Sequence, residues 1–248
     1  MRRRLWLAVS VALIAALSLA IGARSHLLPT QVAENLGLRA DISEIRARQR
    51  PLLTQALEEK GLSFGAPVHI RIFKEEAELE LWVADGDSYA LFRAYPICSF
   101  SGGLGPKLQE GDRQAPEGFY NVDRSALNPG SRYHLSFNLG FPNAFDRANG
   151  RTGSFLMVHG KCVSIGCYAM TDPAIEEIYV LVEAALDAGH PAVPVHAFPF
   201  RMTEARLAQA EGHAWFGFWQ SLAPAYNTFE DTRQLPTILV QNAQYQLQ

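Results

Sequence analysis

The sequence predicts an α+β fold, because its strand-like and helix-like segments are grouped in separate stretches of the chain. Three neighbouring segments, 68–73, 78–84 and 89–97, alternate apolar and polar residues around turn signals. A helical spacing of apolar residues marks 41–60 and 172–188. With 248 residues, 48% of them hydrophobic and 19% charged, the chain is long enough for one substantial domain or two small ones.

The N-terminal residues have the pattern of an export signal. Three arginines at positions 2–4 precede a run of 19 uncharged residues from Leu5 to Ala23. The small residues Ser18 and Ala20 suit signal-peptide cleavage, whereas a run of this length also approaches the ~20 residues that span a bilayer. Positive charges before the run place the rest of the chain across the membrane in either case. We therefore expect an exported, periplasmic protein whose signal is cleaved, with an anchor in the inner membrane through an uncleaved N-terminal segment as the alternative.

A formal net charge of −3 argues against nucleic acid as a partner. Proteins that hold nucleic acid present a basic surface to its phosphates. The chain lacks that excess of positive charge, and it has no helix-turn-helix or zinc-finger spacing. We therefore expect no binding to nucleic acid.

The first helix should cover 41–60, with Pro51 starting or kinking its second part and Gly61 ending it. After the three strands, the region 101–153 is rich in Gly, Pro, Asn and Ser, and it predicts long loops that contain short strands at 119–120 and 134–137. Loops of this composition often carry function.

A small apolar run at 154–158 predicts a buried strand. Clear start and stop signals predict a helix at 172–188. Asp172 can cap this helix, Pro173 suits its first position, and Gly189 can close it. The remaining predicted elements are a strand at 193–197, a helix at 203–222 that packs on the domain through Trp215, Phe216, Phe218 and Trp219, and a strand at 237–240.

The residues that could take part in catalysis lie between His159 and Cys167, which are eight positions apart. A nucleophilic cysteine needs a base, a group that orients the base, and backbone N–H donors for the oxyanion. Gly160 and Gly166 allow a tight loop and a close backbone approach to a scissile carbonyl. An imidazolium neighbour lowers a thiol pKa from ~8.5 to below neutral, so the pairing predicts a thiolate at ordinary pH.

Two plainer interpretations remain open from spacing alone. His159 can be a satisfied histidine at a strand end, and Cys167 a small buried hydrophobe. His159, Cys162 and Cys167 are also soft metal ligands, but no second half of a zinc motif follows them. We therefore expect neither a metal nor a cofactor.

The same segment resembles the signature of the YkuD-type L,D-transpeptidases, in which histidine-glycine is followed by serine-x-glycine-cysteine. Here these are His159-Gly160 and Ser164-Ile165-Gly166-Cys167. The stretch 111–120 resembles the family's threonine-proline-x-glycine-x-phenylalanine sequence, and 101–107, 141–143 and 157–160 resemble its YafK-like branch. The resemblance covers roughly residues 65 to 200.

This resemblance implies a β-rich catalytic domain, a mixed sheet or β-sandwich with flanking helices, that acts on peptidoglycan stem peptides. Cys167 would attack the diaminopimelate carbonyl and form a thioester, which an amine converts to a cross-link and water hydrolyses. His159 would be the base, oriented by the carbonyl of Gly160, and the N–H groups of Gly166 and Cys167 would form the oxyanion hole. Ser164 is expected to contact the substrate. The YafK-like branch implies a further partner, the outer-membrane lipoprotein linked to peptidoglycan.

Two positions depart from the family pattern. Many members have a histidine and an arginine where this chain has Ile165 and Ala169. That arginine would hold a substrate carboxylate, so its absence suggests a different acceptor or leaving group. Three loop arginines could replace the charge, with a plain loop role as the alternative for each: Arg132, Arg147 and Arg151.

Two smaller expectations concern the remaining cysteines and a second histidine. Three cysteines are an odd number for an oxidising compartment, and a Cys98–Cys162 disulfide is the one pairing that leaves Cys167 free. The sequence leaves open whether their Cα atoms come within ~7 Å. His134 lies in an alternating segment, which favours a structural role.

These observations together predict four parts of the chain: a signal or anchor at 1–23, a helical segment at 24–64, a catalytic domain at 65–200, and a helix and strand packed on it at 201–248. The leading hypothesis is a cysteine enzyme that forms cross-links or hydrolyses the link between peptidoglycan and the lipoprotein. The rival is a non-catalytic protein that binds peptidoglycan or acts as an envelope scaffold.

Overall fold

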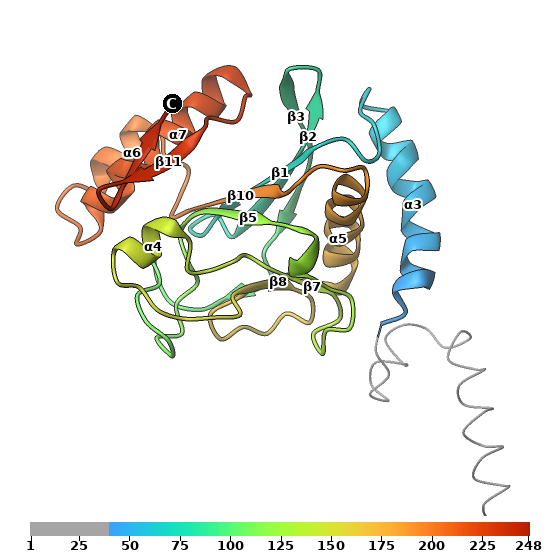
Figure 1. Cartoon of the computed structure of the whole chain (residues 1–248), viewed down its shortest axis with the longest axis horizontal. Helices are drawn as coiled ribbons and strands as arrows, with labels where there is room; N and C mark the ends of the chain where they lie inside the picture. Colours follow the sequence, from blue (N-terminus) through green and yellow to red (C-terminus); the bar gives the residue numbers. More distant parts are fainter. Residues whose placement is uncertain (1–39) are drawn as a thin grey trace, which may run out of the picture. The chain divides into compact units, whose positions relative to one another are not determined.

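A computed structural model describes residues 40–248 (Figure 1). The predicted signal or anchor at 1–23 lies outside these residues. The architecture below is that of the compact unit Ile42–Gln248. Among the residues described, no helix combines the length and the apolar character needed to cross a bilayer. The predicted division of the chain into four parts stays a prediction.

The larger of two mixed sheets has five strands in the order β3-β2-β1-β10-β5. The strands are β1 (Val68–Phe73), β2 (Glu78–Asp85), β3 (Ser88–Pro96), β5 (Gly118–Val122) and β10 (Val193–Phe198). β1 and β10 are parallel, and the other neighbours are antiparallel. The three strands expected between residues 68 and 97 are thus present, as is the strand expected at 193–197.

Helices cover both faces of this sheet, and every residue of β1 is therefore buried. Figure 1 shows α5 (Asp172–Asp187) and α7 (Phe216–Thr232) on opposite sides of β1 and β10. Rings of α7 pack on one face, where Phe229 meets Trp82 at 5.0 Å and Tyr226 meets Phe198 at 5.5 Å between ring centroids. A strand covered on both faces does not show the alternation of buried and exposed residues that is typical of a strand with one face in solvent.

The second sheet has the order β4-β9-β8-β7-β6. Its strands are short: β4 (Ser99–Phe100), β6 (Leu127–Asn128), β7 (Ser136–Asn138), β8 (Met157–His159) and β9 (Tyr168–Ala169). β8 and β9 are parallel, and the remaining pairs are antiparallel. The buried strand expected at 154–158 is partly wrong, because β8 begins at Met157 and Phe155 is 75% exposed.

The helix that follows β9 begins close to the expected position, but its N-cap residue is not the expected Asp172. Thr171 is the N-cap, and its hydroxyl accepts from the N–H of Ala174. Asp172 is the first helical residue, and its carboxylate accepts from the N–H of Lys161 at 2.7 Å. The acidic side chain therefore fixes the loop before Cys167 instead of capping the helix.

The N-terminal helix α3 (Ile42–Glu58) is continuous through Pro51. It packs against α5 through charged and polar groups as well as apolar ones. Arg46 forms two hydrogen bonds of 2.6 Å with Glu183, and Gln49 donates to Glu176 at 3.0 Å. These contacts tie the segment before the first strand to the domain that contains β1.

The single helix expected at 203–222 is wrong. The chain forms α6 (Glu204–Gln209), turns at Gly212 with φ +86°, and then forms α7, which continues through Pro224 to Thr232. Burial of Tyr226 and Phe229 on the large sheet extends α7 beyond the proline. The aromatic group does pack on the domain, since Trp219 is 1% exposed. The remaining elements are α4 (Ala144–Ala148), a 3-10 turn (Arg124–Ala126), and the hairpin of β11 (Ile238–Gln241) and β12 (Gln244–Leu247).

Candidate active site

Two neighbouring strands of the second sheet bring His159 and Cys167 to one face. The parallel register of β8 and β9 pairs His159 with Ala169. Continuing this register places Cys167, which directly precedes β9, beside Met157. Residues two apart on a strand share a face, so Cys167 lies diagonally across from His159. The N–H of Met157 lies 3.4 Å from the Cys167 Sγ, as this placement requires.

An open cavity of about 420 Å³ lies on this face. His159, Cys167 and Met157 line it between two other groups of residues. One group, from the β6–β7 segment, is Asn128, Ser131, Arg132, Tyr133 and Ser136, and the other, from the loops around β8, is Phe155, Val163, Ser164 and Ile165. The expected nucleophile and the expected base therefore line one cavity.

The imidazole of His159 is held in one tautomer by the next residue. Its Nδ1 lies 2.6 Å from the carbonyl oxygen of Gly160, and a carbonyl only accepts, so Nδ1 carries the proton. The Tyr133 ring lies 5.0 Å from the imidazole between ring centroids. Nε2 is left as the nitrogen that can accept a proton, and the expected contact of His159 with the Gly160 carbonyl is present.

The two N–H groups expected to form an oxyanion hole are occupied by hydroxyls. Gly166, at φ +107°, donates its N–H to the Ser101 hydroxyl. Cys167 donates its N–H to the Ser164 hydroxyl at 3.0 Å, and that hydroxyl donates to the Cys167 carbonyl at 2.6 Å. Ser164 therefore closes the turn that carries the nucleophile. Both N–H groups must exchange a hydroxyl for substrate oxygen before they can stabilise an oxyanion.

The pKa shifts contradict the thiolate expected from the sequence. Burial raises the pKa of the Cys167 thiol, which the N–H of Met157 and the charge of Lys107 offset only in part. Burial also lowers the pKa of His159, against a smaller opposing effect of the Gly160 carbonyl. At pH 7 the resting pair is a neutral thiol and a neutral imidazole. A thiol in this state needs a base that removes its proton during attack, and the neutral Nε2 of His159 has the lone pair for that role.

This protonation state predicts a high-pH profile for alkylation of Cys167. Because its pKa is raised, the rate of reaction with iodoacetamide should still be rising with pH above the ordinary thiol value of ~8.5. Among the described cysteines Cys167 is the one free thiol, so intact mass under non-reducing conditions follows it alone. The urea-unfolded protein, as control, should titrate near the ordinary value. A plateau between pH 6 and 7 in the folded protein would show a preformed thiolate instead.

The structure confirms the Cys98–Cys162 disulfide. The two Cα atoms are 5.1 Å apart, and the bond joins residues separated by 64 positions. It links the start of β4 to the loop between His159 and Cys167, and it leaves the nucleophile unpaired. Since the Cys162 sulfur is covalently paired, the metal site considered for this segment lacks one of its three ligands. No cluster of three His, Cys, Asp or Glu side chains suited to a metal occurs in the described part of the chain.

Removing this disulfide with Cys98→Ser and Cys162→Ser together should lower the free energy of unfolding by about 2–4 kcal/mol. The reason is that the cross-link restricts the unfolded chain over a long loop. Urea unfolding of the oxidised protein and the double variant measures the difference. Dithiothreitol should lower the stability of the wild type but not of the variant. Equal unfolding midpoints for the two proteins would contradict the expectation.

The three candidate arginines lie in different surroundings. Arg132 lines the cavity and forms no ion pair with any residue that the structure describes. Arg147 donates to the Pro142 carbonyl on the surface. Arg151 is buried, pairs with Asp146 at 2.8 Å and is not among the described residues that line the cavity, so its expected contact with substrate stays a prediction. The charge of the Arg151 guanidinium is balanced by the carboxylate of Asp146.

The remaining predicted positions are now placed. His134 is buried, and its Nε2 lies 2.9 Å from a carboxylate oxygen of Glu176, which supports the structural role. Ala169 is fully buried beside His159, so no cation stands where many family members have arginine. Ile165 is 80% exposed and lines the cavity.

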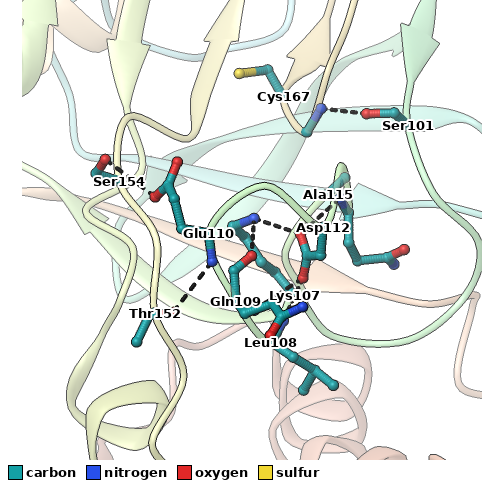
Figure 2. Close-up of polar contacts among 12 residues, drawn as sticks. Ser101, Lys107, Leu108, Gln109, Glu110, Asp112, Ala115, Thr152, Ser154 and Cys167 are labelled. Atoms are coloured by element: carbon teal, nitrogen blue, oxygen red, sulfur yellow. Dashed lines mark hydrogen bonds and ion pairs between the residues drawn. The ribbon is translucent and has the colours of Figure 1, made fainter.

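Sequence analysis missed the contacts that hold the 101–115 loop beside Cys167 (Figure 2). Asp112 organises the loop, because its carboxylate accepts from three backbone N–H groups, those of Leu108, Gln109 and Gln114. Lys107 adds an ion pair to the same carboxylate at 2.5 Å. An aspartate after a glycine in a polar stretch is a turn signal, which could have identified this residue.

A buried ion pair next to this loop was also missed. Lys74 and Glu117 are both fully buried, with 2.9 Å between Nζ and Oε1. Lys74 also donates to the carbonyls of Gly105 and Ala115, and Glu117 accepts from the indole N–H of Trp219. The network joins β1, the loop that begins at β4, and α7. These positions are far apart in sequence, and no local pattern marks them.

Comparison with known proteins gives the context for this site. The family model described as "YkuD: L,D-transpeptidase catalytic domain" matches residues 67–196. The Escherichia coli (strain K12) protein named "Putative L,D-transpeptidase YafK" is 51% identical over 188 residues, which are 76% of each chain.

Solved structures with a similar fold share less sequence. The cell shape determining protein Pgp2 of Campylobacter jejuni (K307A mutant) has a TM-score of 0.46 and 20% identity, covering 66% of this chain and 56% of that one. Bd1075 of Bdellovibrio bacteriovorus has a TM-score of 0.40 and 17% identity, covering 71% of this chain and 77% of that one. The family match includes the segment that contains His159 and Cys167. The similarity to the E. coli protein covers about three quarters of the chain. The chain therefore belongs to the YkuD family of L,D-transpeptidase catalytic domains.

Proposed function

We propose that this protein is a cysteine acyl-transfer enzyme of the bacterial envelope that acts on peptidoglycan stem peptides through a Cys167 thioester. The observation that carries the proposal is the placement of the one free thiol of the described residues and a single-tautomer imidazole on the wall of one cavity. Family membership supplies the substrate class. The intact nucleophile and base favour catalysis over a purely peptidoglycan-binding or scaffolding role.

The first half-reaction uses His159 as base and then as acid. Nε2 takes the proton of the Cys167 thiol as sulfur attacks the diaminopimelate carbonyl. The resulting oxyanion would draw the N–H groups of Gly166 and Cys167 away from their serine hydroxyls. The imidazolium then protonates the departing amine, and the thioester remains. A buried, neutral pair suits this cycle, because no charge is stored in the resting site.

Arg132 is our candidate for recognition of a substrate carboxylate. It is the one arginine or lysine among the described residues that line the cavity, and no carboxylate lines that cavity with it. A guanidinium can hold a carboxylate through two parallel hydrogen bonds. Ser164 lines the cavity as well, but both of its hydrogen bonds go to Cys167, so its contribution to binding would be through the shape of the turn.

For the second half-reaction we propose hydrolysis, with the link between peptidoglycan and its outer-membrane lipoprotein as the bond cleaved. The similarity to the YafK-like branch supports this choice over cross-linking, and so does the alanine at position 169 in place of the usual arginine. An exported location, through residues 1–23, fits the disulfide, because such bonds persist in oxidising compartments.

The test is to incubate purified protein with sacculi that carry the lipoprotein and to identify the products by mass spectrometry. Release of lipoprotein, with stems ending at diaminopimelate, is the expected result. New links between two diaminopimelate residues would contradict hydrolysis and show that the second half-reaction is transpeptidation. Unchanged muropeptides, together with pull-down on sacculi by both the wild type and Cys167→Ala, would favour the peptidoglycan-binding protein.

A further inference from the structure

Ser136 is a buried hydroxyl in the wall of the catalytic cavity. The residue is 1% exposed, and its Oγ has no hydrogen-bond partner among the residues described. Burying a hydroxyl without a partner is unfavourable, because its hydrogen bonds to water are lost and not replaced. Such a group is rare in folded proteins and calls for a physical reason. Because Ser136 lines the cavity, a molecule bound there can supply the missing partner.

Strand register places Ser136 next to the base. β7 and β8 are antiparallel, and Ser136 is paired directly with His159. On the other side of β8, Ala169 is paired with His159. Side chains of directly opposed residues share a face and have Cβ atoms ~4.5–5.5 Å apart. Of the two side chains that flank His159 in this row, one is a buried methyl group and the other is the Ser136 hydroxyl.

The other serine hydroxyls that line the cavity already have partners. Ser164 is bonded to the N–H and the carbonyl of Cys167. Ser131 accepts from the N–H of Tyr133 at 2.9 Å. Within the described lining, Ser136 is therefore the serine whose hydroxyl lacks a hydrogen-bond partner.

We propose that Ser136 positions the acceptor of the second half-reaction, a water molecule or an amine, between His159 and the Cys167 thioester. This role rests on the proposed function. Nδ1 of His159 is bonded to the Gly160 carbonyl, so Nε2 receives the proton of the acceptor. A hydroxyl can donate or accept. It donates to the second lone pair of an attacking water, and it accepts the second N–H of an attacking amine.

The step is balanced without a cofactor. The acceptor oxygen or nitrogen forms a bond to the thioester carbonyl carbon, and its proton passes to Nε2. The tetrahedral intermediate collapses with cleavage of the C–S bond. The imidazolium returns the proton to the Cys167 thiolate. The products are a free thiol and a peptide acid when water attacks, or a peptide amide when an amine attacks.

The experiment separates the two half-reactions. Wild type and Ser136→Ala are acylated with a diaminopimelate stem peptide, excess donor is removed, and the thioester is followed by intact mass. We expect similar acylation rates and a thioester that decays about 10-fold more slowly in the variant, the loss of one positioning hydrogen bond. Ser136→Thr, which keeps the hydroxyl, should decay as the wild type does. Hydroxylamine, a nucleophile that needs no base, should cleave both thioesters at one rate.

Ser131→Ala is the matched control, because it removes a cavity hydroxyl that is not paired with His159. Its thioester should decay at the wild-type rate, whatever happens to acylation. Equal decay in wild type and Ser136→Ala would overturn the proposal, as would a parallel loss of acylation and decay, which marks a structural role. If the wild type forms no Cys167-dependent thioester with any stem peptide, the proposed function fails and the positioning role fails with it.

Discussion

Replacing Cys167 with alanine is expected to abolish the covalent adduct that the wild-type protein forms with a carbapenem, an acyl-donor mimic for this family. The thioester can form only at a free thiol, and the other two cysteines are joined in a disulfide. Turnover of stem peptides should fall by about 10⁶-fold, the scale seen when a catalytic nucleophile is removed. Intact mass after carbapenem treatment measures the adduct directly.

Thiol titration under native, non-reducing conditions is the control for this variant. The cysteines of the wild type should give one reactive thiol and those of Cys167→Ala none, with unchanged unfolding by urea. An adduct that survives in the variant at another residue would contradict the assignment of the nucleophile. If Cys167→Ala lost the adduct only because it failed to fold, its urea unfolding midpoint would lie below that of the wild type.

Replacing Lys74 with methionine is expected to lower the free energy of unfolding by about 3–5 kcal/mol. The cause is the carboxylate of Glu117, which would remain fully buried without its counter-charge. Burial lowers the pKa of Lys74, and the neighbouring Glu117 opposes that shift, so the charged state of Lys74 depends on the carboxylate beside it. Urea unfolding at pH 7 measures the loss.

A double variant isolates the buried charge from the loss of packing. Lys74→Met with Glu117→Gln should recover part of the stability, because a neutral amide can still bond to the indole N–H of Trp219. A double variant no more stable than the single one would contradict the charge argument. Acylation of Cys167 should weaken in the single variant as well, since Lys74 also holds the carbonyls of Gly105 and Ala115.

Local patterns predicted the parts of the fold that depend on local physics. The alternation in β1 to β3 and the apolar stripe of α5 are properties of contiguous residues, so their ranges could be read directly. His159 and Cys167 were found because a short glycine-containing loop joins them. The continuation of α7 past Pro224 was missed, because burial of Phe229 on a distant strand outweighs the signal of the proline.

The candidate site depends on long-range pairing that no local pattern encodes. Ser101 reaches Gly166 across 65 positions, and the register of β7 and β8 sets Ser136 beside His159. The raised pKa of Cys167 arises from burial by residues that are remote in sequence, so the spacing of His159 and Cys167 suggested the opposite sign. The ion pair of Arg151 with Asp146 could not be predicted either, because the two residues meet only once the loop is folded.

The hydrogen bond from Trp219 to Glu117 bears on how the protein can be handled as a reagent. The segment matched by the family, 67–196, stops before α7 begins. A recombinant fragment cut at that boundary would leave the aromatic face of β1 and β10 in water and would strip a donor from a carboxylate in the interior. The smallest piece that can be expected to survive purification therefore includes α7 and also the hairpin of β11 and β12, whose Tyr245 is buried against Phe119 and Phe145.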